Sequence, residues 1–231
     1  LFGLAVTDDD THLWLVGASG AIGEYDVTSG SLTDRSAPMD VTNNFTDVAV
    51  TGQSGSARVT VTGASGKVYY SAGNGESGTW NSVTPGSGAG VRAVDFYAGT
   101  EGHIVDGNQT VYATTDGETW SKTGISDADV GFEGVDSDAA DDVWVVGGSG
   151  TVFHWNGSAW STTTAGEPTL VDVVVAADDQ SGFAVGNSGA VFAYDGSAWV
   201  RQETPTGQNL TAVVQGDPAI AVGAGGTILE R

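Results

Sequence analysis

A short pattern repeats six times along the 231-residue chain, and no other feature constrains the fold as strongly. Each copy is an apolar run followed by a turn of small residues, as in LVGASG, VVGGSG and AVGNSG. The copies are anchored at Gly17, Gly63, Asp106, Gly147, Gly186 and Gly223, which are 46, 43, 41, 39 and 37 residues apart. A period of about 40 residues made of short strands is typical of a β-propeller. The sequence predicts an all-β, six-bladed propeller of four-stranded antiparallel blades, with five or seven blades as the alternative.

Each repeat divides into four extended segments, and in the fourth repeat these are 132–136, 142–147, 151–155 and 160–164. Asn156-Gly157 separates the last two, and Asn-Gly between apolar runs favours a two-residue hairpin with both turn residues at positive φ. We expect one domain over residues 1–231, with blades at 1–39, 40–87, 88–127, 128–166, 167–206 and 207–231.

The sixth repeat contains only three extended segments. Propellers often close by borrowing a strand from the other terminus, which removes an exposed sheet edge. Because Leu1 starts directly on the first strand of the first blade, we expect either a three-stranded last blade or a fourth strand from upstream of Leu1.

The chain is strongly acidic, with 29 Asp and Glu against 7 Lys and Arg and a net charge of −22. Such a surface repels itself at low salt, whereas at about 1 M salt the screening length falls to about 3 Å. This balance predicts a halophilic source, specifically an archaeon, and the alternative is an ordinary acidic secreted protein. Nucleic acid is not an expected partner, because there is no basic patch to displace phosphate counterions.

The absence of cysteine excludes disulfides and thiolate–metal sites. No apolar stretch reaches the length of about 18 residues that a membrane span requires. Four glycosylation sequons favour an exported glycoprotein at the cell surface or outside the cell, and they begin at Asn44, Asn108, Asn156 and Asn209.

Residues 136–166 closely resemble a repeat of bacterial and archaeal extracellular propellers, with DDVWVVGGSGTVFHWNGSAW as the matching run. Residues 182–202 are similar. Residues 110–120 (TVYATTDGETW) resemble the Asp-box of BNR and sialidase-type propellers, also seen in photosystem II assembly factors, although one residue is missing between Asp116 and Trp120. The resemblance implies the fold, but such repeats serve many functions.

No catalytic constellation stands out. A sialidase would need an arginine cluster, and only Arg92 falls on an innermost strand. His12, His103 and His154 fall in different blades, which argues against a site shared among them. We therefore expect no catalytic residues, no metal and no cofactor.

Two further groups have competing interpretations. The acidic runs Asp8–Asp10, 136–142 and Asp178–Asp179 are expected in loops between the first two strands of their blades, as calcium ligands or as solvated acids. Four tryptophans open the fourth strand of their blades, which favours packing between blades over carbohydrate stacking: Trp80, Trp120, Trp160 and Trp199.

The innermost strands carry the candidate binding residues Asp47, Arg92, Glu133 and Asp172, at the second or third strand position. Polar groups at these positions would surround one mouth of a central channel, where closed β architectures commonly bind ligands. The alternative is a water-filled channel with no specific ligand.

These observations predict a non-enzymatic binding or scaffolding module that contacts protein or glycan, as part of a larger surface protein or filament. One alternative is a polysaccharide-active glycosidase or lyase with its site at the channel mouth. Another is an assembly factor.

Overall fold

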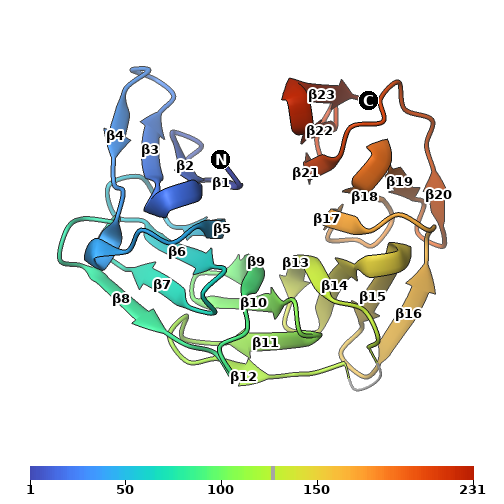
Figure 1. Ribbon diagram of the computed structural model, residues 1–231, viewed down its shortest axis with the longest axis horizontal. Coiled ribbons are helices and arrows are strands. Elements are labelled where there is room, and N and C mark those ends of the chain that lie inside the picture. The colour runs from blue at the N-terminus through green and yellow to red at the C-terminus, as the bar shows by residue number, and fades with distance from the viewer. Residues whose placement is uncertain (126–127) are drawn as a thin grey trace. The chain divides into compact units, whose positions relative to one another are not determined.

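The computed structural model describes residues 1–125 and 128–231, which form six antiparallel sheets, the blades of a β-propeller (Figure 1). The predicted all-β, six-bladed fold is confirmed. The chain divides into two compact units of three blades each, Leu1–Gly124 (unit 1) and Ile125–Arg231 (unit 2). The blade boundary expected at residue 127 lies outside the described residues. Within the described ranges, no helix is long and apolar enough to cross a membrane.

Unit 1 contains blades 1 to 3, and in each blade the strands lie side by side in chain order. Blade 1 comprises β1 (Gly3–Val6), β2 (His12–Val16), β3 (Ile22–Asp26) and β4 (Leu32–Asp34). Blade 2 comprises β5 (Phe45–Thr51), β6 (Arg58–Gly63), β7 (Val68–Ser71) and β8 (Trp80–Val83). Blade 3 comprises β9 (Val91–Ala98), β10 (Glu101–Asp106), β11 (Thr110–Thr114) and β12 (Ser121–Lys122).

Unit 2 contains blades 4 to 6 with the same strand order, and this chain supplies three strands to the last blade, which fits both expectations. Blade 4 comprises β13 (Phe132–Ala139), β14 (Asp142–Gly147), β15 (Thr151–Trp155) and β16 (Trp160–Thr164). Blade 5 comprises β17 (Leu170–Val175), β18 (Gly182–Gly186), β19 (Val191–Tyr194) and β20 (Trp199–Arg201). Blade 6 comprises β21 (Leu210–Val214), β22 (Ile220–Gly223) and β23 (Thr227–Glu230).

The loop between the third and fourth strands differs from the expected two-residue hairpin. Gly157 has a φ of 82°, but Asn156 is not among the residues with positive φ. The Asn156 side-chain oxygen instead accepts the N–H groups of Ser158 at 3.1 Å and Ala159 at 3.0 Å. This Asx turn satisfies two amides, so the backbone of the first residue stays in an unstrained region. Three aspartates build the same loop in other blades: Asp26, Asp116 and Asp195.

Tryptophan packing joins neighbouring blades within each unit. Trp14 of blade 1 is fully buried in a cluster with Trp80 of blade 2. The equivalent Trp144 of blade 4 lies 6.0 Å, edge to face, from Trp199 of blade 5. The predicted inter-blade role therefore holds for Trp80 and Trp199. Trp120 lies edge to face with Phe96 and packs against a cluster that spans blades 2 and 3, whereas Trp160 lies beside Trp155 of its own blade.

Candidate binding site

The predicted channel-mouth positions coincide with β-bulges in the first strand of five blades. The strand register shifts across the second residue of each of these strands, namely Thr46, Arg92, Glu133, Val171 and Thr211. A bulge leaves this residue outside the ladder and redirects its side chain, which is a common device beside binding sites. Arg92 is exposed and Glu133 is half-buried. Ligand binding by these two residues stays a prediction.

The two predicted aspartates hold neighbouring blades together. Asp47 Oδ2 accepts the backbone N–H of Val94 in blade 3 at 3.0 Å. Asp172 Oδ2 accepts the N–H of Val213 in blade 6 at 2.8 Å. A ligand role for either carboxylate also stays a prediction, but the structure gives both a stabilising role, because an amide that loses its acceptor on burial is costly.

Asp8–Asp10 and Asp178–Asp179 lie between the first two strands of their blades, as expected, whereas the run at 136–142 lies largely within strands. Asp136 and Asp138 fall inside β13, and Asp136 Oδ2 accepts the N–H of Val175 in blade 5 at 2.7 Å. Asp9 lies in the β1–β2 turn, and its carboxylate accepts the hydroxyls of Thr7, Thr11 and Ser54. These hydrogen bonds hold the pKa of Asp9 well below its usual range.

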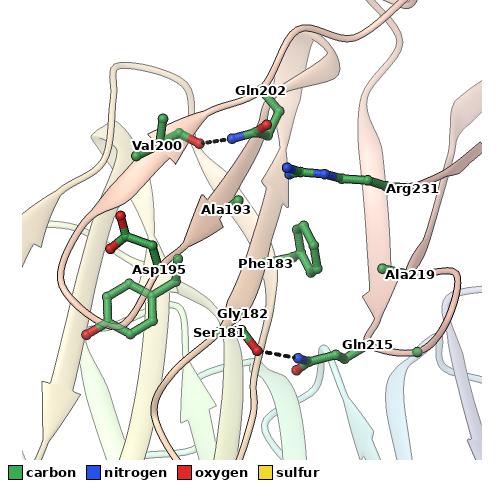
Figure 2. Close-up of a pocket in the computed structure, with 12 residues that line it drawn as sticks. Ser181, Gly182, Phe183, Ala193, Asp195, Val200, Gln202, Gln215, Ala219 and Arg231 are labelled. Atoms are coloured by element: carbon green, nitrogen blue, oxygen red, sulfur yellow. Dashed lines mark hydrogen bonds between the residues drawn. The ribbon is translucent and has the colours of Figure 1, made fainter.

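The structure adds a groove between blades 5 and 6, with a volume of about 600 Å³ (Figure 2). The Arg231 guanidinium carbon lies 5.7 Å from the centre of the Phe183 ring. Gln215 donates from Nε2 to Ser181 Oγ at 2.8 Å, and the two residues bring β21 and β18 together on one side of the groove. The groove therefore has an apolar surface with polar groups at its margin.

The groove arises because blade 5 carries smaller side chains at repeat positions that are filled in blade 4. Trp144 lies opposite His154 in blade 4, and Phe183 lies opposite Ala193 at the same strand positions in blade 5. In blade 4 the Trp144 and His154 rings stack at 3.9 Å and occupy the space next to blade 5. Sequence reasoning missed the groove, although the aligned runs DVWVVG and SGFAVG contain the signal.

Tyr194 and Arg231 line the groove, and so does the carboxylate of Asp195. Its Oδ1 accepts the Ser197 hydroxyl and the N–H groups of Ser197 and Ala198, so the pKa of this carboxyl is lowered. An ionised carboxylate is a poor proton donor.

The histidines lie in β2, β10 and β15 of three blades, as expected. A single histidine nevertheless joins two carboxylates, because Asp142, His154 and Asp179 hold potential ligand atoms within 4.8 Å of one another. Sequence reasoning compared the histidines only with one another and missed this group. The signal was the spacing of Asp142 and Trp144. Residues two apart on a strand share a face, and His154 lies opposite Trp144 on the neighbouring strand.

His103 makes the folded state sensitive to acid. It is buried, and burial lowers its pKa to about 4, against about 6.5 for an exposed histidine. The contribution of neutral His103 to the free energy of unfolding is fully present above about pH 6.5. It is lost as the pH falls toward about 4, because the unfolded chain then binds a proton that the folded chain does not. The loss should reach about 3 kcal/mol at 1.36 kcal/mol per pH unit.

Urea unfolding at constant high salt, between about pH 7.5 and 4.5, measures this loss. We expect the free energy of unfolding of the natural chain to fall more steeply with acid than that of His103→Gln. Parallel pH profiles for the two proteins would contradict a buried neutral imidazole.

The four predicted glycosylation residues are all exposed, outside the strands. Asn44 and Asn209 also support the fold, because their side-chain oxygens each accept the N–H of a turn serine in the preceding blade, Ser19 and Ser188, at 3.0 Å. Glycosylation itself stays a prediction.

No family model and no curated protein matches the sequence. Among solved structures, a streptogramin B lyase superimposes with a TM-score of 0.77 at 12% identity, over 99% of this chain and 81% of that one. YCF48 from Cyanidioschyzon merolae superimposes with a TM-score of 0.58 at 18% identity, over 100% of this chain and 94% of that one. A chain of a mitotic checkpoint complex superimposes with a TM-score of 0.76 at 11% identity, over 97% of this chain and 74% of that one. These neighbours include an enzyme and non-enzymes, so at such low identities the likeness establishes the β-propeller fold alone.

Proposed function

We propose that this chain is a non-enzymatic binding or scaffolding module that contacts a protein partner through blade 6. The observation that carries the proposal is an exposed apolar surface on that blade. Val214, Val222 and Ile228 are 57%, 38% and 66% exposed. We call these three residues the open face of blade 6. Contiguous exposed apolar groups commonly mark protein interaction sites.

Strand register explains why these side chains share one face. Val222 lies opposite Ile228 and Ala212, and Val214 is two residues beyond Ala212 on the same strand. The alternate residues Val213, Ala221 and Leu229 pack toward blade 5. Blade 6 therefore has one face packed against its own unit and a second apolar face that, among the residues the structure describes, packs on no other blade of that unit.

The third strand of blade 6 also offers a backbone edge. Arg231 and Ala219 exchange both backbone hydrogen bonds at 3.0 Å, which makes them a hydrogen-bonded pair of the ladder. In an antiparallel ladder such pairs alternate with residues whose N–H and C=O groups point away. Ile228 and Glu230 therefore direct their backbone groups away from β22, where a partner's strand can add to the sheet.

The charge and the sequons support a surface location in a halophile. Unit 2 contains only two basic residues, Arg201 and Arg231, so its remaining surface is acidic and suited to concentrated salt. Exposed sequons support export, and intact-mass measurement of the protein from its native source tests this part. A native mass equal to that of the bare chain would remove the argument from glycosylation.

Site-specific photo-crosslinking in the native host tests the partner. A photo-reactive residue at Ile228 should give a discrete protein adduct. The same residue at Val200, which is 50% exposed on the last strand of blade 5, is the matched control and should give none. Ile228→Asp, combined with a photo-reactive residue at Val214, should abolish the adduct. Equal adducts at positions 228 and 200 would contradict the proposal.

The enzyme alternative is tested by glycosidase and lyase screens at high salt. Because Asp47 and Asp172 hold blades together, loss of activity on their substitution would be ambiguous. Turnover that disappears in Arg92→Gln or Glu133→Gln, with unfolding midpoints unchanged, would place a catalytic site at the bulges and overturn the proposed function.

A further inference from the structure

Three side chains of the kinds that bind metal ions lie close together between blades 4 and 5 of unit 2. Asp142 begins β14, His154 lies in β15, and Asp179 lies in the turn between β17 and β18. Their ligand atoms lie within 4.8 Å of one another, and His154 Nε2 is 2.9 Å from Asp142 Oδ1. We propose that these three residues, here called the Asp-His cluster, bind a divalent first-row transition ion such as Zn²⁺, which links blade 4 to blade 5.

Local structure positions each member of the cluster. Asp142 and Trp144 are two residues apart on β14 and so share a face, and Trp144 lies directly opposite His154. The two rings stack at 3.9 Å with an interplanar angle of 6°, which fixes the imidazole plane. The Trp144 indole N–H donates to Asp179 Oδ1 at 3.2 Å. One tryptophan therefore orients ligands from both blades, as groups behind a metal site do.

The cluster places two carboxylates around one imidazole, and histidine is its one basic residue. Only two basic residues belong to unit 2, and both lie over aromatic rings elsewhere, Arg201 over Phe192 and Arg231 over Phe183. His154 Nε2 lies 2.9 Å from Asp142 Oδ1, and the Asp179 carboxylate lies within 4.8 Å of both. A divalent ion would balance this charge.

Asp138 supplies a second, independent observation. The register of β13 shifts between Ser137 and Ala139, so Asp138 is a bulge residue with a redirected side chain. Its Oδ2 atom is buried, and no residue that the structure describes gives it a hydrogen bond. A buried acceptor oxygen without a hydrogen-bond partner is costly. A bound cation beside the cluster would relieve this unfavourable environment.

The ligand types select the class of ion. Calcium and magnesium prefer oxygen ligands, and calcium takes six or more of them. An imidazole with carboxylates instead suits zinc, manganese and related ions. The proposal therefore requires His154 to be a ligand, which separates it from general cation binding by an acidic surface.

Titration of the chelator-treated full chain with Co²⁺ and Zn²⁺ tests the proposal. It is done in about 2 M sodium nitrate, which screens the surface and whose anion binds these ions weakly. We expect saturable binding of about one equivalent, with visible Co²⁺ absorption that Zn²⁺ displaces. His154→Gln and Asp179→Asn should each weaken binding at least about tenfold. Asn tolerates the φ of 56° at Asp179, so this variant should keep its turn.

Two control variants distinguish metal binding at the cluster from nonspecific binding by other surface residues and from a simple His154–Asp142 contact. His12→Gln removes a partly exposed histidine of blade 1 and should leave both affinity and spectrum unchanged. Trp144→Phe keeps an aromatic ring over His154 but removes the indole N–H, so it should weaken binding while retaining a histidine-type Co²⁺ spectrum. Equal affinities of the natural chain and His154→Gln, equal affinity for Ca²⁺, or no saturable binding would each overturn the proposal. The last result would leave His154 and Asp142 as an ion pair only.

Discussion

Lowering the salt concentration should destabilise this protein. The chain carries 29 acidic and 7 basic residues, and both units share this imbalance. At about 0.1 M salt the screening length is about 10 Å, so many surface carboxylates repel one another, whereas at about 1 M it is about 3 Å. We expect the thermal midpoint to rise by at least about 10 °C between about 0.1 and 3 M KCl. For a chain of this length that corresponds to roughly 3–5 kcal/mol.

A charge-reduced variant separates screening from the general stabilising effect of concentrated solutes. Glu101, Glu203 and Glu230 are exposed. Replacing all three with Gln should raise the midpoint at about 0.1 M KCl and change it little at about 3 M, where repulsion is already screened. A flat salt profile for the natural chain would contradict the halophilic interpretation, as would parallel profiles for the two proteins.

The repeat allowed the architecture to be predicted, because strand period and turn residues are local properties. The strands of blade 4 illustrate this, since β14, β15 and β16 begin and end where the sequence predicted. The loop at Asn156 did not follow the prediction. Asn-Gly favours a tight hairpin by backbone conformation alone, but here the side chain of Asn156 captures two amides and stabilises a longer loop.

The candidate sites were harder to predict, because they depend on which side chains meet between blades. Asp47 and Asp172 were correctly placed on innermost strands, yet their hydrogen bonds to Val94 and Val213 depend on the neighbouring blade. The Asp-His cluster likewise combines residues of two blades. Residue spacing within one repeat indicates which face a side chain occupies, but not what the next blade places opposite it.

The tight turn at Gly150 should tolerate substitution poorly, and blade 6 provides an internal control. Gly150 has a φ of 63°, and a Cβ there would overlap the backbone carbonyl of Gly166. The connector runs this close because Ala165 donates its N–H to the Gly150 carbonyl at 2.8 Å. A side chain at this position therefore meets two penalties, one from backbone conformation and one from overlap with backbone that cannot move without breaking this hydrogen bond.

Gly226 occupies the same turn position in blade 6, with a φ of 75°, but nothing lies within 4 Å of its Cβ position. Gly226→Val should therefore cost only the conformational penalty, about 1–2 kcal/mol. Gly150→Val should cost about 3–5 kcal/mol, because overlap with fixed backbone adds to that penalty. Denaturant unfolding of both variants at constant high salt measures the difference. Equal losses would show that backbone conformation alone requires glycine here, whereas a larger loss at Gly150 would show that the connector requires it too.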